Sequence, residues 1–121
     1  GAIVARLQES FLERIEAFCD RAVDVADALA ERRISVRVVD QVLASGTSVG
    51  ANVYEADEAM SAADFIKCLC IATKELNEFR FWVRLAGRRG WVAAARLGPL
   101  EQEAGEIKKI LGTIISRSKR R

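Results

Sequence analysis

Residues 61–87 read SAADFIKCLCIATKELNEFRFWVRLAG, and they carry the clearest periodic pattern in this chain of 121 residues. Apolar residues recur at alternating spacings of four and three, which places them on one face of an α-helix. The heptad rhythm is typical of a helix that packs in a bundle. Its members are Phe65, Leu69, Ala72, Leu76, Phe79, Val83 and Ala86.

The sequence also indicates where this helix begins and ends. Ser61 is a suitable N-cap with Asp64 at the third helical position, which is a variant of the capping box. Met60 precedes the cap, and we expect it to pack on Phe65 as a hydrophobic staple. Gly87 suits the position just past the helix end. The linker that follows is short, so the next helix should be an antiparallel neighbour.

Three further segments show helical periodicity. The first contains Val4, Leu7, Phe11, Ile15, Phe18, Ala22, Val25 and Leu29, the second contains Ile34, Val38, Val42, Ser45, Val49, Val53 and Ala56, and the last contains Leu97, Leu100, Ala104, Ile107, Leu111 and Ile114. Because proline is tolerated in a first helical turn, Pro99 leads us to start the last helix between Ala94 and Leu97. The sequence thus predicts an all-α, antiparallel up-down-up-down four-helix bundle, with residues 1–121 forming a single domain.

Composition narrows the function classes. The chain has no histidine, so the commonest general base and the commonest metal ligand are both missing. Its three cysteines are an odd number, which we interpret as free buried thiols in a reducing cytoplasm. No apolar run reaches the length of a membrane span. We therefore expect a cytoplasmic, non-enzymatic protein without metal, cofactor, membrane contact or small-molecule substrate.

Charge is divided unevenly along the chain. Residues 1–64 contain 6 Lys or Arg and 12 Asp or Glu. Residues 65–121 contain 13 Lys or Arg and 5 Asp or Glu, so the second half is basic. Arg80, Arg84 and Arg88 repeat every four residues and form a cationic column on one side of their helix. Two interpretations stay open: the column pairs with the acidic first helix, or it binds phosphates.

The last residues of the chain form a second basic group. The tail contains Arg117, Lys119, Arg120 and Arg121. Cations are favourable at a helix C-terminus through the helix dipole alone, and they also suit a nucleic-acid arm. The aromatic residues Phe81, Trp82 and Trp91 could stack on bases, but filling the bundle or a subunit interface is the preferred interpretation.

The stretch 43–56, LASGTSVGANVYEA, is rich in small residues at helical spacing. It lacks the Lys-Ser/Thr pair of a phosphate-binding loop, so we interpret it as a close approach between helices. Asn52 and Glu55 share one face, and we expect them to hydrogen-bond to the third helix and fix its register.

The same stretch, followed by residues 61–86, resembles the family named after proteins encoded in intervening sequences of bacterial 23S rRNA genes. That family shows Ser-x-Ser-x-Gly-Ala-Asn-x-x-Glu, then Ser-x-x-Asp-Phe and Ile-Ala-x-x-Glu-Leu-x-Glu. The matching residues here include Ser48, Gly50, Ala51, Asn52, Glu55, Ser61, Asp64, Phe65, Ile71, Ala72, Glu75 and Glu78. One departure is the acidic Asp57-Glu58 step, where relatives carry glycine and a basic residue.

The resemblance implies a bundle that assembles into a homopentameric ring. The chain also resembles, more distantly, the accessory variability proteins of diversity-generating retroelements. This second resemblance implies RNA or a reverse-transcriptase-like protein as a partner. Two functions follow for this chain. One is an oligomer that binds RNA or an RNA-handling protein through its basic surfaces, and the alternative is a structural or adaptor oligomer without affinity for nucleic acid.

Overall fold

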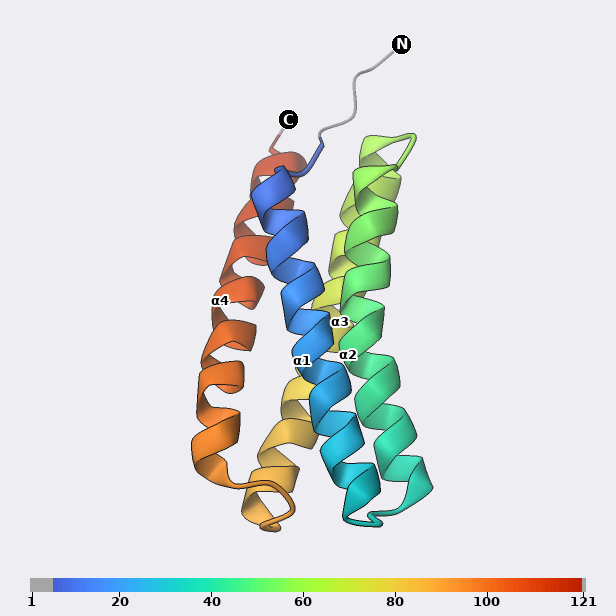
Figure 1. Ribbon diagram of the computed structural model, residues 1–121. Coiled ribbons are helices and arrows are strands. Elements are labelled where there is room, and N and C mark those ends of the chain that lie inside the picture. Colours follow the sequence, from blue (N-terminus) through green and yellow to red (C-terminus); the bar gives the residue numbers. More distant parts are fainter. Residues whose placement is uncertain (1–5, 121) are drawn as a thin grey trace.

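The computed structural model describes residues 6–120 and shows four long helices (Figure 1). They are α1 (Glu9–Glu31), α2 (Val36–Asp57), α3 (Ala62–Arg88) and α4 (Ala94–Lys119), and the described part of the chain contains no strand. Successive helices run antiparallel. Each helix packs on its two neighbours in the order α1, α2, α3, α4 and back to α1, so α1 and α3 lie on a diagonal. The predicted all-α architecture of four helices is confirmed.

The core lies along the axis between the helices and draws on all four. All seven periodic residues of 61–87 are buried, as the heptad pattern predicts. Phe18 of α1 and Phe79 of α3 meet edge to face, with ring centroids 5.3 Å apart. This aromatic pair joins the two diagonal helices through the centre of the bundle. In α1 the helix begins two residues after Leu7, and Val4 lies outside the described residues.

Two glycines let α1 and α2 approach closely. A Cβ atom on Gly46 would lie 2.4 Å from the Cβ of Ala22, and one on Gly50 would lie 2.6 Å from the Sγ of Cys19. Neither position has room for a side chain. The small-residue stretch is therefore a helix-packing surface, as predicted, and its partner is α1.

The start of α3 follows the capping prediction only in part. The Ser61 hydroxyl accepts a hydrogen bond from the Asp64 amide at 3.1 Å, which confirms the N-cap. The staple is wrong, because Met60 is 90% exposed. The turn after α2 instead directs Ala59 into the core, and Met60 consequently faces solvent.

The glycine that terminates α3 lies three residues beyond the predicted one. The helix continues through Gly87 to Arg88, and Gly90 adopts a positive φ of 69°. The amides of Gly90 and Trp91 donate to the carbonyls of Gly87 and Ala86, which is the Schellman arrangement. Gly87 was the wrong choice because only Gly90 occupies the left-handed conformation that favours glycine.

Pro99 also differs from the prediction. Helix α4 begins at Ala94, inside the predicted range, so Pro99 is its sixth residue and lies beyond the first turn. Proline at this position removes one hydrogen bond to the preceding turn. The residue is exposed, which leaves the freed carbonyl of Ala95 accessible to water.

Candidate nucleic-acid interface

The arginine column of α3 does not face the acidic helix. Arg84 and Arg88 are exposed and Arg80 is half-buried, and all three lie on the helix diagonal to α1. Within residues 6–120 none of them forms an ion pair within 4 Å; the ion pairs there join Arg6 to Glu58 and Arg14 to two carboxylates of α4. Of the two interpretations of the column, pairing with α1 is wrong, because the bundle topology separates α1 from α3.

The two loops at one end of the bundle bring further arginines to this column. The Arg32 guanidinium donates to the Gly90 carbonyl at 2.9 Å, which joins the α1–α2 loop to the α3–α4 loop. The segments 30–37 and 84–96 together carry seven arginines and a single acidic residue, Glu31. We call these exposed arginines the basic end: Arg32, Arg33, Arg37, Arg84, Arg88, Arg89 and Arg96.

Five members of the basic end were missed by the sequence reasoning. Arg32, Arg33 and Arg37 lie in the acidic half of the chain, so a division by halves hides them. The signal that could have found them is topological. In an up-down bundle the first and third connections lie at the same end, so basic residues in both connections must meet.

The basic tail lies at the opposite end. Arg117 and Lys119 occupy the last turn of α4, and Arg120 follows it. About 24 helical residues separate Arg96 from Arg120, which is roughly 36 Å. The predicted column and the predicted tail therefore do not form one surface. Arg121 lies outside the described residues.

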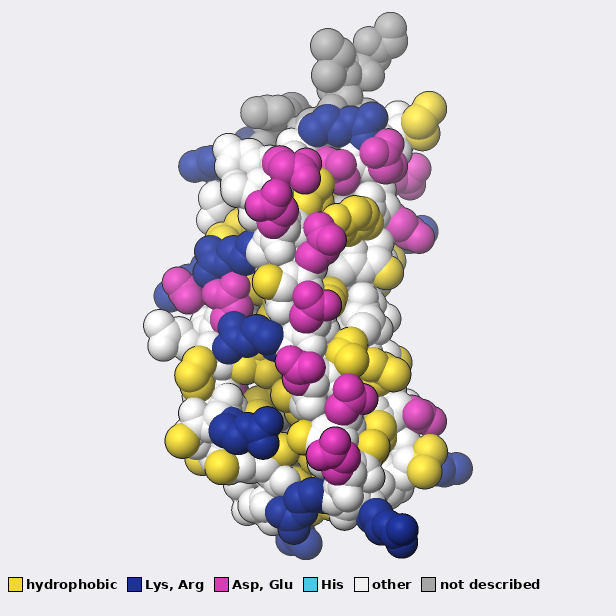
Figure 2. Space-filling model, in the orientation of Figure 1, with side chains coloured by type: hydrophobic (Ala, Val, Ile, Leu, Met, Phe, Trp, Pro, Cys, Tyr) yellow, Lys and Arg dark blue, Asp and Glu magenta, His cyan; other side chains and the backbone are white. Residues whose placement is uncertain are grey.

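The outer face of α1 is an acidic ridge. Its exposed members recur at spacings of three and four along the helix, and Figure 2 shows them as a line of carboxylates down the middle of that face. They are Glu9, Glu13, Glu16, Asp20, Asp24 and Asp27. The negative charge of this ridge disfavours a polyanion on that face of α1.

The aromatic residues divide between core and surface. Trp82 and Trp91 are half-buried against the core, as preferred from the sequence. Phe81 is 57% exposed on the outer face of α3 and stacks edge to face on Trp82, with ring centroids 5.2 Å apart. Phe81 does not fill the bundle.

The polar signature residues do not fix the register of α3. The Asn52 amide donates to the Ser48 carbonyl of its own helix at 2.9 Å, and Glu55 is exposed. The expected polar pair is wrong, because both positions sit at the edge of the packed face rather than inside it. Glu75 is half-buried on α3.

The acidic step that departs from the family pattern has a structural role. Asp57 Oδ1 accepts a hydrogen bond from the Leu7 amide at 2.8 Å, and Arg6 contacts both the Asp57 carbonyl and the Glu58 carboxylate. These contacts tie the segment before α1 to the end of α2. The carboxylates are already occupied by this chain, and their charge disfavours an anion at the turn.

Part of the exposed surface of α2, between the charged residues Asp40 and Glu55, is uncharged. Residues 41–54 contain no Asp, Glu, Lys or Arg, and Leu43 and Tyr54 are 39% and 43% exposed. Small residues, including exposed Ala44 and Ala51, surround them. Depletion of charge around tyrosine and aliphatic side chains is typical of the core of a protein interface.

Nucleophile and metal chemistry have little support in the described residues. Burial raises the pKa of the Cys19 thiol and that of the Cys68 thiol, so both thiols stay protonated at neutral pH. All three cysteines are free, but their predicted burial is wrong, because Cys19 and Cys68 are only half-buried and Cys70 is exposed. Across residues 6–120 no cluster of three His, Cys, Asp or Glu has the geometry to hold a metal ion, and no helix is long and apolar enough to cross a membrane.

Comparison with known proteins agrees with the signature residues. Residues 10–113 match the model of the family described as 23S rRNA-intervening sequence protein. A crystal structure of a protein of unknown function from the S23 ribosomal protein family of Bacteroides thetaiotaomicron is similar, with 36% identity and a TM-score of 0.82. The similarity covers 86% of this chain and 96% of that one. No curated protein matches the sequence significantly. The chain belongs to the family of 23S rRNA-intervening sequence proteins.

Proposed function

We propose that this protein is a non-enzymatic RNA-binding bundle that contacts the phosphate backbone through its basic end. The observation that carries the proposal is the meeting of seven arginines from two loops and three helices at one end of the bundle, where Glu31 is the one acidic residue of these segments and Glu101 of α4 lies beside Arg84 and Arg88. Arginine forms bidentate hydrogen bonds with phosphate oxygens, and such side chains favour phosphate recognition. The family name records where the genes of these proteins lie, so the choice of RNA as the polyanion rests on the more distant resemblance to the accessory variability proteins.

The distribution of charge indicates the side of the bundle from which RNA approaches. The acidic ridge of α1 and the basic column of α3 lie on diagonal helices, so their exposed faces point to opposite sides of the bundle. RNA approaches the α3 side, where Arg84 and Arg88 continue the basic end along the helix. The tail at Arg117 to Arg120 is a separate cationic group and contributes less.

We also propose that the chain assembles into a homo-oligomer, with the homopentameric ring that the resemblance implies. The uncharged stretch 41–54 of α2 supports a contact between subunits, because Leu43 and Tyr54 are exposed near its two ends and no residue between them carries a charge. Cyclic assembly would repeat the basic end once per subunit. Repetition raises the avidity for a long polyanion without any new contact.

Salt dependence of binding tests the RNA proposal. Binding of single-stranded and duplex RNA is measured by fluorescence anisotropy over a series of salt concentrations. For single strands, the log-log slope changes by about 0.7 for each neutralised phosphate. The double variant R84Q/R88Q should therefore weaken binding and reduce the magnitude of the slope by about 1.4. The matched double variant K108Q/K109Q removes the same charge from α4 and should leave the slope nearly unchanged.

Two outcomes would count against RNA binding at the basic end. One is the absence of binding to either kind of RNA at low salt, which would favour the adaptor function through α2. The other is an equal loss in both double variants, which would mean that net charge alone drives binding. Light scattering tests assembly separately: Tyr54→Arg should reduce the molar mass toward that of a monomer, and a monomeric wild-type protein would exclude the ring.

A further inference from the structure

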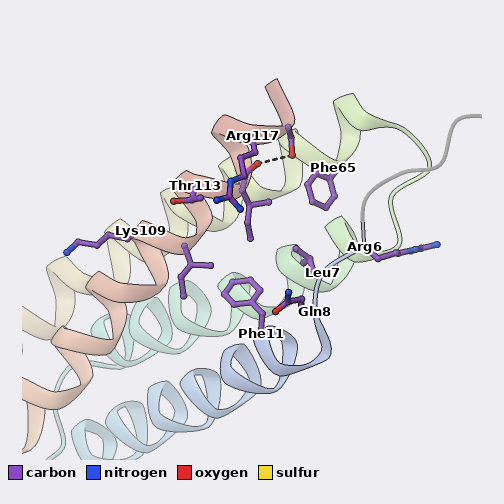
Figure 3. Close-up of a pocket in the computed structure, with 11 residues that line it drawn as sticks. Arg6, Leu7, Gln8, Phe11, Phe65, Lys109, Thr113 and Arg117 are labelled. Atoms are coloured by element: carbon purple, nitrogen blue, oxygen red, sulfur yellow. Dashed lines mark hydrogen bonds between the residues drawn. The ribbon is translucent and has the colours of Figure 1, made fainter. Parts of the chain in front are cut away.

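A cavity of about 600 Å³ opens at the end of the bundle opposite the basic end. It lies between the start of α1, the start of α3 and the last turns of α4 (Figure 3). The helices α1 and α4 pack less closely on each other than the other neighbouring pairs do. The cavity therefore forms along the loosest seam of the bundle, and its volume falls within the usual range for small-molecule sites.

The floor of the cavity is apolar. Phe11 and Phe65 are 8% and 2% exposed, and their rings approach it from α1 and α3. Leu7 before α1 and the half-buried Ile110 and Ile114 of α4 complete the floor. A hydrocarbon chain or ring placed here would remove these side chains from water, which is favourable by the hydrophobic effect.

The rim of the cavity is cationic. Arg6, Lys109 and Arg117 line it, and no lining residue is a carboxylate. Arg6 points away from the rings and is held by the end of α2, whereas Lys109 and Arg117 form no ion pair within residues 6–120. Glu106, three residues before Lys109 on α4, lies 3.6 Å from Arg14. Thr113 supplies a hydroxyl group beside these cations, whereas the Ser118 hydroxyl donates to the Ile114 carbonyl of its own helix at 2.8 Å.

We propose that this cavity binds an amphipathic anion, whose apolar body lies between Phe11 and Phe65 and whose carboxylate or phosphate head meets Arg117 and Lys109. The apolar floor alone would accept any hydrophobic molecule. The cations make the selection, because a neutral or positively charged head gains no charge-assisted hydrogen bond at the rim. The site is independent of the RNA surface, which lies at the other end of the bundle.

Isothermal titration calorimetry with ten-carbon probes tests this site. Decanoate and decyl phosphate, each kept below the concentration at which it forms micelles, present the two head groups. Decanol and decyltrimethylammonium present the same chain with a neutral and a positive head. We expect both anions to bind, the tighter one identifying the head group, and both other probes to bind at least tenfold more weakly.

Two variants locate the binding. Thr113→Trp places a large side chain in the cavity from an exposed position and should abolish binding. Arg117→Gln should weaken binding of the anions about tenfold and leave decanol unchanged. Lys74→Gln, which removes an exposed cation outside the cavity, is the matched control and should have no effect. Far-UV circular dichroism confirms that each variant is folded.

The site is refuted by any of three results. The first is that neither anion binds the wild-type protein. The second is that decanol binds as tightly as decanoate. The third is that Thr113→Trp binds the anions like the wild type while remaining folded. None of these results bears on the salt-dependent binding of RNA at the basic end.

Discussion

Arg14 of α1 and Glu103 of α4 form a bidentate ion pair between the two neighbouring helices that pack least closely. The Nε–Oε2 distance is 2.7 Å and the Nη2–Oε1 distance is 2.6 Å, and the Glu103 side chain is only 18% exposed. The hydrogen bonds from Arg14 hold the pKa of Glu103 below its ordinary value, although burial opposes this effect. The pair ties together two helices that otherwise have few contacts.

Loss of this pair should destabilise the protein in a pH-dependent way. Because the pKa of Glu103 is lowered in the folded state, its contribution is fully present above the pKa of the unfolded chain. It is lost as the pH falls through the folded pKa, in the acid range below 4.5. Glu103→Gln should therefore cost about 0.5–1 kcal/mol at neutral pH, and urea unfolding should show this difference shrinking in acid. Glu106→Gln is the control and should cost much less, because Glu106 lies 3.6 Å from Arg14 and is 52% exposed.

Gly46→Ala should destabilise the bundle. The new methyl group would meet the Cβ of Ala22 at 2.4 Å and the ring of Phe79 at 3.1 Å, and a Cβ atom cannot rotate away. Overpacking of this kind costs about 1–3 kcal/mol, which exceeds the helix-propensity gain of about 1 kcal/mol. Gly112→Ala is the matched control, because nothing lies within 4 Å of its Cβ position. Thermal unfolding should show Gly112→Ala to be more stable than the wild type, and equal effects of the two substitutions would contradict the close approach of α1 and α2.

Arg33→Gly should stabilise the protein. Arg33 has a φ of 58° at the end of α1, where the amides of Arg33 and Ile34 donate to the carbonyls of Ala30 and Leu29. This is the same Schellman arrangement that Gly90 completes at the end of α3. A side chain in the left-handed region is strained, so glycine should gain about 0.5–1 kcal/mol in chemical denaturation. The converse variant, Gly90→Ala, should lose a similar amount, and a loss of stability in Arg33→Gly would show that the strain is absent.

Tyr54 should lose its proton at a higher pH than an ordinary tyrosine. Its hydroxyl donates to Glu16 Oε2 at 2.6 Å, and this hydrogen bond, with the nearby negative charge, raises the pKa of Tyr54 to about 12. The chain contains one tyrosine, so tyrosinate absorbance reports this residue alone. Glu16→Gln should move the midpoint down toward the ordinary value of 10.0. Circular dichroism over the same pH range establishes that the helices persist, and an unchanged midpoint would exclude the contact between α1 and α2 at this position.

The sequence predicts the helices well because burial in a bundle imposes a local period. Each of the seven apolar residues from Phe65 to Ala86 is buried, and Ser61 caps the helix as its side chain and position predict. Helix ends are harder to predict, since Gly87 and Gly90 are both plausible stops and only the backbone conformation distinguishes them. The prediction for Met60 is wrong for a similar reason. The turn between α2 and α3 decides which of the adjacent apolar residues Ala59 and Met60 faces the core.

The sequence by itself determined that four amphipathic helices form, that a small-residue stretch permits close packing, and which family the signature residues indicate. Local spacing suffices for each of these. Only the tertiary structure decided what meets across the helices. It placed α3 diagonal to α1, which leaves the arginine column free of the acidic ridge, and it joined Arg32 to Gly90 so that two distant loops form one basic end. It also opened the cavity between Phe11, Phe65 and Arg117, which lie far apart in the sequence. Such surfaces depend on the angles and separations of helices, and these are set by the whole core rather than by any one segment.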